Sequence, residues 1–205
     1  MSRKTIGIVD YGVGNHASVQ RAFQALGHAC RLSNEKNFLA SVDVMVLPGV
    51  GAFPAAMQAL HALDMVDFIR DKASEGKAII GLCLGMQLLA EISLEYESTE
   101  GLGLIPGTVQ PLQHSACHIG WNALEVLHHD PLLIPCDRMS VYFNHSYVFE
   151  APEVYRAARM SLDGYSYTAA VRKGNVCGLQ FHPEKSQTVG KQLLNRLVDG
   201  LGHAK

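Results

Sequence analysis

Residues 77–90 carry the sequence KAIIGLCLGMQLLA, which places a cysteine between two glycines, after an apolar run and before a helix-like segment. A short apolar run followed at once by a helical pattern predicts a buried strand of residues 77–80 that turns tightly into a helix. Gly81 and Gly85 relieve the crowding of such a turn. We therefore expect Cys83 to project above a sheet edge as a nucleophile elbow.

The rest of the N-terminal half alternates strand-like and helix-like segments. It predicts strands at residues 5–9 and 42–47 and helices at residues 17–26 and 54–75. Strands separated by helices form βαβ units, which build a parallel sheet covered on both faces. Ligands bind such sheets beyond the carboxyl ends of the strands, where both Cys83 and the PGVG loop of residues 48–51 fall.

The second half of the chain changes character. Short strand-like segments follow one another at residues 108–110, 123–127, 139–143, 155–159, 167–171 and 176–181. They predict an antiparallel extension or a second sheet, and residues 187–201 predict a closing amphipathic helix. The expected fold class is α/β: a doubly wound, mostly parallel sheet flanked by helices, with an antiparallel strand extension in the second half.

Composition narrows the function. The 205 residues, 48% apolar and 18% charged, predict one domain over residues 1–205. A net charge of -2 gives no reason to expect nucleic acid, and no apolar stretch approaches the ~18 residues of a membrane span, so we expect a cytoplasmic protein. Five scattered cysteines predict neither a disulfide framework nor a zinc site, and we expect no metal and no cofactor.

A second candidate segment lies near the C-terminus. Pro183 favours an extended conformation at His182, so His182 and Glu184, two positions apart, can point at one site. An imidazole that takes the thiol proton of Cys83, oriented by a carboxylate, would form a catalytic triad. The helix predicted after Cys83 would favour its thiolate and offer N–H groups to an oxyanion. The alternatives are a buried structural cysteine and an incidental surface ion pair, and the two segments together favour catalysis.

A glycine pattern near the N-terminus offers another interpretation. Residues 12–17 (GVGNHA) follow the first predicted strand and match the G-x-G-x-x-A dinucleotide fingerprint. The acidic residue expected after the second strand is poorly supplied, because residues 32–34 are Leu-Ser-Asn and Glu35 comes only afterwards. The pattern is weak, and a non-enzymatic nucleotide-binding module stays an alternative.

The combined motifs resemble a known family. GLCLGMQ at residues 81–87 and GLQFHPE at residues 178–184 resemble the class I, triad-type glutamine amidotransferases. Within that class the motifs are similar to those of the glutaminase subunits of imidazole glycerol phosphate synthases, which belong to histidine biosynthesis. This narrower likeness is carried by residues 10–15 (DYGVGN), 47–53 (LPGVGAF), 118–122 (HIGWN), 142–147 (YFNHSY) and 185–186 (KS).

The resemblance implies hydrolysis of L-glutamine to L-glutamate and ammonia through a γ-glutamyl thioester on Cys83, with His182 and Glu184 completing the triad. It also implies that the ammonia passes to a (β/α)8-barrel cyclase subunit in a heterodimer, which makes imidazole glycerol phosphate and AICAR. The oxyanion would be held by backbone N–H groups of Leu84 and the Val50–Gly51 segment. Substrate binding would fall to Gly51, Gln87, Ser146 and Tyr147. The partner interface would include Asn15, Trp121, Asn122 and Lys185.

Two positions depart from the family pattern: Ala116-Cys117 stands where proline usually precedes the His-x-Gly-Trp-Asn motif, and Asn144 replaces an apolar residue. We also expect the loop of residues 48–51 to switch its backbone, since glycines on both sides of Val50 make a peptide rotation inexpensive. Two rival enzymes stay open: an amidotransferase that feeds anthranilate, aminodeoxychorismate, pyridoxal phosphate or purine synthesis, and a stand-alone cysteine hydrolase.

Overall fold

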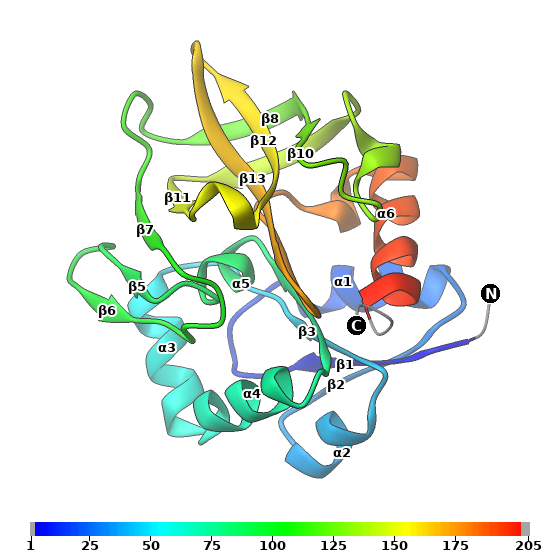
Figure 1. Cartoon of the computed structure of the whole chain (residues 1–205). Helices are drawn as coiled ribbons and strands as arrows, with labels where there is room; N and C mark the ends of the chain where they lie inside the picture. The colour runs from blue at the N-terminus through cyan, green and yellow to red at the C-terminus, as the bar shows by residue number, and fades with distance from the viewer. Residues whose placement is uncertain (1–2, 202–205) are drawn as a thin grey trace.

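The computed structural model describes residues 3–201, and its main sheet has eight strands in the order β2-β1-β3-β4-β14-β13-β12-β9 (Figure 1). The first five strands of this order are parallel, whereas β13, β12 and β9 pair antiparallel. In chain order the strands are β1 Thr5–Val9, β2 Ala29–Ser33, β3 Val44–Leu47, β4 Ala78–Leu82, β9 Glu125–Val126, β12 Arg156–Leu162, β13 Tyr165–Lys173 and β14 Val176–Leu179.

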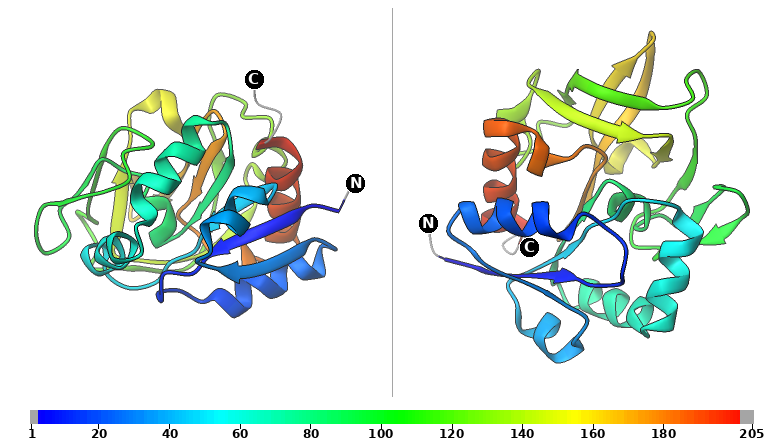
Figure 2. Two further views of the ribbon diagram at one scale, coloured as in Figure 1. Left: turned by 90° about the horizontal axis from the view of Figure 1, so that it is seen from below. Right: turned by 180° about the vertical axis from the view of Figure 1, so that it is seen from behind.

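Helices cover both faces of the parallel strands (Figure 2). Helices α1 and α6 pack on the face that carries Ile8 and Val46, and α3 and α4 pack on the face that carries Val9 and Met45. Because both faces are buried, these strands are apolar at successive positions rather than at alternate ones. The helices are α1 His16–Ala25, α2 Lys36–Ser41, α3 Phe53–Ala62, α4 Met65–Ser74, α5 Leu84–Gln87 and α6 Gln187–Gly200.

Two smaller sheets are formed by strands between residues 92 and 150. One pairs β10 with β8, and the other has the order β11-β7-β5-β6. Their strands are β5 Ile92–Ser93, β6 Thr99–Glu100, β7 Thr108–Pro111, β8 His118–Ala123, β10 Ser140–His145 and β11 Tyr147–Glu150. Single 3-10 turns occur at η1 Ile134–Cys136, η2 Glu153–Tyr155 and η3 Pro183–Lys185. The predicted fold class, a mostly parallel α/β sheet with an antiparallel extension, is confirmed.

Some element predictions were wrong. The helix predicted over residues 54–75 is two helices, because Asp64 takes a left-handed φ of 52° between α3 and α4. Aspartate is one of the few residues other than glycine that tolerate this conformation. The strand predicted at residues 123–127 is interrupted at Leu124, whose side chain is buried. The sequence did not predict α2, β5, β6 or β11, and it missed residues 118–122 of β8.

The arrangement brings distant segments to one edge of the sheet. Strand β14 lies beside β4, with Leu179 opposite Leu82, so the residues that follow both strands emerge together at the carboxyl edge. None of the helices within residues 3–201 is both long and apolar enough to cross a membrane.

Candidate active site

The turn after β4 has the strained backbone that the sequence predicts. Cys83 adopts φ 54° and ψ -110°, a conformation that residues other than glycine rarely take. A Cβ atom on Gly85 would lie 1.8 Å from the carbonyl oxygen of Leu47, and one on Gly81 would lie 2.5 Å from that of Gly85. Only glycine fits at either position, because strand β3 and the turn itself approach so closely.

The helix after Cys83 is shorter than expected. Helix α5 spans only Leu84–Gln87, so a long helix dipole does not act on the thiol. The first hydrogen bond of the turn runs from the Met86 N–H to the Cys83 carbonyl, at 3.0 Å. The N–H groups of Leu84 and Gly85 precede it and are available to an oxyanion. This turn can therefore stabilise an oxyanion through its local N–H groups and not through a helix macrodipole.

His182 lies between the other two members of the predicted triad. It follows β14 with an extended backbone, as Pro183 predicts, and its Nδ1 is 2.8 Å from Oε1 of Glu184. The side chains of His182 and Glu184 are only 5% and 2% exposed. Cys83 and His182 line the same cavity, and the sulfur is close enough to the imidazole to act on its pKa. Because Glu184 occupies Nδ1, Nε2 is the ring nitrogen left to exchange a proton with the thiol.

The surroundings of His182 favour its charged form. Burial by itself lowers the pKa of His182, but the hydrogen bonds and negative charges of Cys83 and Glu184 outweigh it and raise the pKa to about 9. An imidazolium beside the sulfur stabilises a thiolate, so this arrangement can support nucleophilic attack followed by proton donation.

A cavity of about 420 Å³ opens above Cys83 and His182. Its walls include the residues predicted to hold the oxyanion and the substrate, namely Val50, Gly51, Leu84, Gln87, Ser146 and Tyr147. Lys185 also lies on its wall. Residues that sequence reasoning did not place here are Ala52, Glu95, Tyr96, Asn144 and His145. The structure thus brings together five separate segments of the chain, within residues 50–52, 83–87, 95–96, 144–147 and 182–185.

Two polar side chains in this cavity have defined partners. Gln87 donates from Nε2 to the Tyr147 carbonyl at 3.0 Å and to Oε1 of Gln180 at 3.1 Å, so its amide braces the cavity wall. Glu95 is 5% exposed, and one of its carboxylate oxygens accepts the Phe53 N–H at 2.7 Å. A buried carboxylate in a cavity of this size fits an ammonium group of a ligand. Several acidic residues surround Glu95 in the sequence, and no local signal singled it out.

The PGVG loop of residues 48–51 packs between Tyr11 and the elbow. The buried Tyr11 hydroxyl donates to the Pro48 carbonyl, and a Cβ atom on Gly49 would lie 2.8 Å from both the Tyr11 oxygen and Cβ of Leu84. Gly51 adopts a φ of 103°, and the Val50 side chain is 42% exposed. Pro48 and Gly49 are therefore held in place, whereas Val50 and Gly51 are the less constrained half of the loop.

The residues predicted for a partner interface are only partly grouped. Trp121, 50% exposed, meets the ring of Tyr142 edge-on at 5.9 Å, and Lys185 Nζ lies 5.6 Å from the centre of the same ring. Asn122 instead donates to the Ser161 carbonyl at 2.6 Å, which ties β8 to β12. Asn15 is exposed at the start of α1. Tyr142 contacts both Trp121 and Lys185. The sequence did not assign it to the interface, because nothing in its motif indicated contact with a partner protein.

The glycine pattern at residues 12–17 does not form an open phosphate site. His16 Nε2 lies 3.0 Å from the Val13 carbonyl, and it would be 3.0 Å from a Cβ atom on Gly14. The imidazole ring therefore lies against the turn, where a dinucleotide would approach. Glu35 pairs with Arg31 at 3.1 Å. These contacts disfavour the nucleotide-binding alternative.

Comparison with known proteins identifies the family of the chain. The family model for class-I glutamine amidotransferases matches residues 7–199, so the chain belongs to that family. A crystal structure of a glutamine amidotransferase superimposes with a TM-score of 0.74, covering 95% of this chain and 97% of that one. The structure of PurLQS from Thermotoga maritima gives 0.76, over 97% and 99%. At 22% and 19% identity, these two structures show the shared fold alone.

Relatives found by sequence similarity indicate which branch of the family the chain belongs to. A Streptococcus gordonii protein named imidazole glycerol phosphate synthase subunit HisH is 42% identical over 196 residues, which cover 94% of each chain. A protein of the same name from Shouchella clausii is 43% identical over 207 residues, covering 95% of this chain and 99% of its own. The chain therefore belongs to the HisH family, and the resemblance drawn from its motifs is confirmed.

Proposed function

We propose that the chain is the glutaminase of an imidazole glycerol phosphate synthase: it hydrolyses L-glutamine to L-glutamate and ammonia and supplies the ammonia to a cyclase subunit. The observation that carries the proposal is the position of the buried His182, which pairs with Glu184 and lines the same cavity as Cys83. Family membership supports the same activity.

The chemistry follows from the three side chains. The Cys83 sulfur attacks the carboxamide carbon of glutamine, and the His182 imidazolium gives its proton to the departing nitrogen, which leaves as ammonia. The product on the enzyme is a γ-glutamyl thioester. Water then attacks this thioester while neutral His182 accepts its proton, and glutamate leaves with the sulfur restored. Glu184 holds the ring through Nδ1, which keeps Nε2 directed at the sulfur.

The two tetrahedral intermediates need donors for their negative oxygen. We assign this role to the Leu84 N–H and to an N–H of the Val50–Gly51 segment, both of which border the cavity. A backbone switch at Val50 would turn the second donor toward or away from the site. Because alanine at Gly49 would clash with Tyr11 and Leu84, Gly51→Ala is the better test of such a switch. Unchanged partner-dependent stimulation in that variant would contradict the switch.

The partner surface is assigned to the cluster of Trp121, Tyr142 and Lys185, together with Asn15. Lys185 borders the cavity and also contacts Tyr142, so this cluster adjoins the mouth of the site. Tryptophan and tyrosine are enriched among residues that dominate binding energy. A cytoplasmic location, a single domain over residues 1–205 and a heterodimer stay predictions.

The test is glutamate release from L-glutamine by the purified chain, alone and with the cyclase and its nucleotide substrate. Cys83→Ala serves as the blank. Strong stimulation by the cyclase that vanishes in the blank is the expected result. Equal activity without the cyclase would favour a stand-alone hydrolase, whereas stimulation only by an anthranilate, aminodeoxychorismate, pyridoxal phosphate or purine partner would assign the chain to that pathway.

A further inference from the structure

Two buried histidines next to the active site are not part of the triad. His118 on β8 and His145 on β10 are directly opposite each other in the antiparallel pair, and they are 5% and 7% exposed. Nδ1 of His118 lies 3.2 Å from Nε2 of His145, and Nδ1 of His145 lies 2.9 Å from the Tyr147 carbonyl oxygen. The His118 ring also stacks on Phe143 at 4.6 Å. The three polar groups form a continuous chain from β8 to Tyr147.

The chain of contacts fixes where each proton lies. A carbonyl oxygen only accepts, so Nδ1 of His145 must carry the hydrogen that it donates to Tyr147. Nε2 of a neutral His145 then has a free lone pair and accepts from Nδ1–H of His118. A second proton on His145 would have to occupy Nε2, and the contact would then survive only if His118 changed to its Nε2–H tautomer and accepted at Nδ1.

The electrostatic surroundings keep both rings neutral. Burial lowers the pKa of His118, partly offset by the negative charge of Asp163. Burial also lowers the pKa of His145, to about 4. The hydrogen bond to the Tyr147 carbonyl opposes this shift, whereas the neighbouring His118 and His182 add to it. His145 therefore does not compete with His182 as the base of the active site, although His145 and His182 both border the cavity.

The segment that the pair holds is a wall of that cavity. The Asn144 carbonyl oxygen lies 3.7 Å from the Cys83 sulfur, and the Tyr147 carbonyl accepts from both His145 and Gln87. The carbonyl groups at both ends of residues 144–147 thus face the nucleophile and a predicted substrate residue. Their positions depend on a hydrogen bond that begins at His118, on another strand.

We propose that His118 and His145 are a neutral positioning pair, which holds residues 144–147 in the shape that binds glutamine. The inference rests on the proposed glutaminase function. Neither residue touches the reacting atoms, and the loss of either should weaken substrate binding more than it slows the chemistry. His118 has this role because its N–H is the only donor that we find for Nε2 of His145 among the described residues.

Two substitutions of His118 separate positioning from packing. His118→Asn keeps an N–H donor close to the place of Nδ1, whereas His118→Phe keeps an aromatic ring against Phe143 but removes the donor. In the complex with the cyclase, we expect His118→Phe to raise the KM for glutamine about tenfold, with a smaller change in kcat, because an acceptor is left unpaired. We expect His118→Asn to stay within about threefold of wild type. Equal KM values in both variants, raised or not, would overturn the proposal.

Nitrogen-15 NMR of the histidine rings gives a second measurement, and the wild-type tautomer that it reports does not depend on how the variants fold. We expect His145 as the Nδ1–H tautomer, with no titration above about pH 5, and a higher pKa in His118→Phe because Nε2 is then free to take a proton. An Nε2–H tautomer, or titration near the ordinary histidine value, would contradict the pair. These spectra do not require glutaminase activity, so an inactive chain with the expected tautomer would refute the proposed function alone.

Discussion

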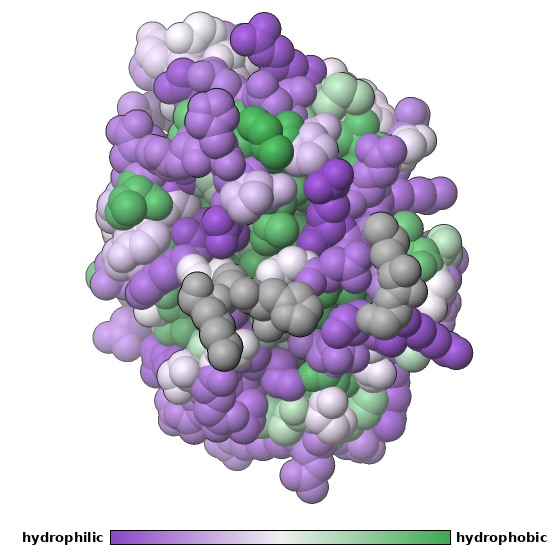
Figure 3. Space-filling view, turned by 45° about the vertical axis from the view of Figure 1, so that its right-hand side comes forward, coloured by the Kyte–Doolittle hydropathy of each residue, from purple (hydrophilic) through white to green (hydrophobic). Residues whose placement is uncertain are grey.

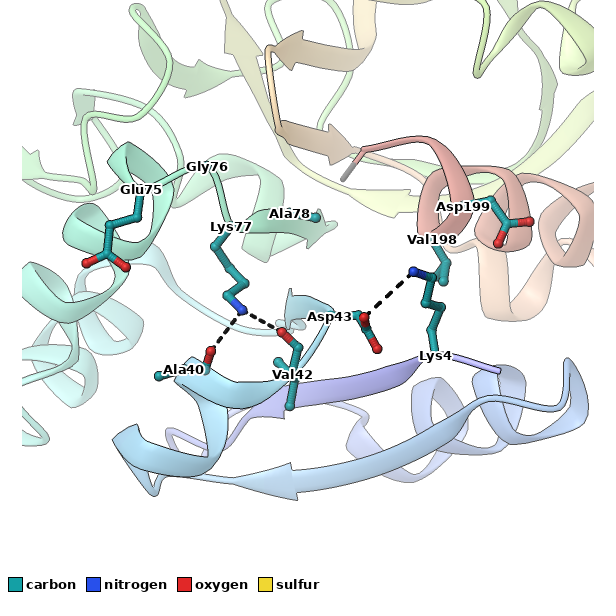
Figure 4. Close-up of a pocket in the computed structure, with 10 residues that line it drawn as sticks. All are labelled: Lys4, Ala40, Val42, Asp43, Glu75, Gly76, Lys77, Ala78, Val198 and Asp199. Atoms are coloured by element: carbon teal, nitrogen blue, oxygen red, sulfur yellow. Dashed lines mark hydrogen bonds and ion pairs between the residues drawn. The ribbon is translucent and has the colours of Figure 1, made fainter. Parts of the chain in front are cut away.

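Two cavities of nearly equal volume, about 420 and 410 Å³, lie at opposite ends of the same parallel strands. The first is at the carboxyl edge and contains Cys83 and His182. The second is at the amino edge, between the beginnings of β1, β3 and β4 and the end of α6, and contains several charged side chains (Figure 4). Volume therefore does not distinguish the candidate active site.

The amino-edge cavity differs in how its polar groups are used. Lys77 donates to the carbonyls of Ala40 and Val42 at 2.9 and 2.5 Å, and Lys4 pairs with Asp43 at 3.7 Å (Figure 4). These contacts join the segments that precede the neighbouring strands β1, β3 and β4. The face around the two chain termini is mostly hydrophilic, with apolar groups scattered over it (Figure 3). The charges here stabilise the fold, whereas those at the carboxyl edge are buried around a strained cysteine.

The direction of the strands decides which of the two cavities can hold a catalytic site. At the carboxyl edge, β3, β4 and β14 each lead into a turn whose residues line the cavity, because neighbouring parallel strands end at the same edge. At the amino edge, the strands are preceded by the ends of helices and by loops. The charged side chains there pair with backbone carbonyls or with partly exposed side chains.

The largest expected effect distinguishes two buried cysteines, one in the turn after β4 and one on the neighbouring strand β14. We expect Cys83→Ala to lower glutaminase kcat by about 10⁶-fold, as the loss of a nucleophile does in other triads. Cys177→Ala on β14 should change it by less than about threefold, because burial raises the pKa of that thiol to about 12 and keeps it protonated. Glutamate release by the complex measures both. Equal losses would mean that Cys83 matters only for packing.

The next effect concerns the orientation and charge of His182. We expect Glu184→Gln to lower kcat by up to about 10⁴-fold, the loss seen when a triad carboxylate becomes an amide. The complex with the cyclase is assayed at saturating glutamine, and a Glu97→Gln variant on the exposed surface is the control. A wild-type kcat in Glu184→Gln would remove Glu184 from the site.

The pH profile gives an independent test of the same histidine. Because its pKa is raised to about 9, we expect wild-type kcat/KM to fall as pH rises through about 9, where His182 loses the proton that ammonia departure needs. In stability terms the raised pKa contributes fully below the ordinary value of 6.5, and the contribution is lost as pH rises through about 9. Glu184→Gln should move the basic limb to lower pH. A limb at the same pH in both proteins would contradict the ion pair.

A smaller effect compares one glycine from each edge. Gly85→Ala at the elbow should lower the free energy of unfolding by about 3 kcal/mol or more, because the new methyl group would overlap the Leu47 carbonyl. Gly76→Ala at the amino edge should cost only about 1–2 kcal/mol, since it meets nothing within 4 Å and strains only the backbone at φ 88°. Urea unfolding measures both. Similar costs would show that the elbow is less tightly packed than its geometry indicates.

The smallest effect belongs to the amino-edge charges. We expect Lys4→Met to change the free energy of unfolding by about 0–1 kcal/mol, because its ion pair with Asp43 is partly exposed to solvent. Glutamine hydrolysis should stay unchanged in this variant. If Lys4→Met altered the KM for glutamine or the response to the cyclase, the amino edge would be part of the functional surface, and its charges would not serve the fold alone.

Local sequence was enough for some of these features. The elbow could be predicted because its strand, glycines and cysteine are contiguous, and His182 and Glu184 because proline fixes the residue before it. The break at Asp64 could not, since the apolar pattern continues through it without glycine or proline. Glu95 could not either, because its place in the cavity depends on how the segment between β5 and β6 packs against α3.

The sequence by itself determined the fold class, the family and the strained position of Cys83, because each is encoded in neighbouring residues. Only the tertiary structure decided the roles of the two histidines in one cavity. His182 meets a thiol and a carboxylate, which raise its pKa to about 9 against the effect of burial, whereas His145 is buried against a second histidine, and its pKa falls to about 4. The physical reason is that a buried group titrates according to the charges and hydrogen bonds around it, and these come from strands distant in the chain.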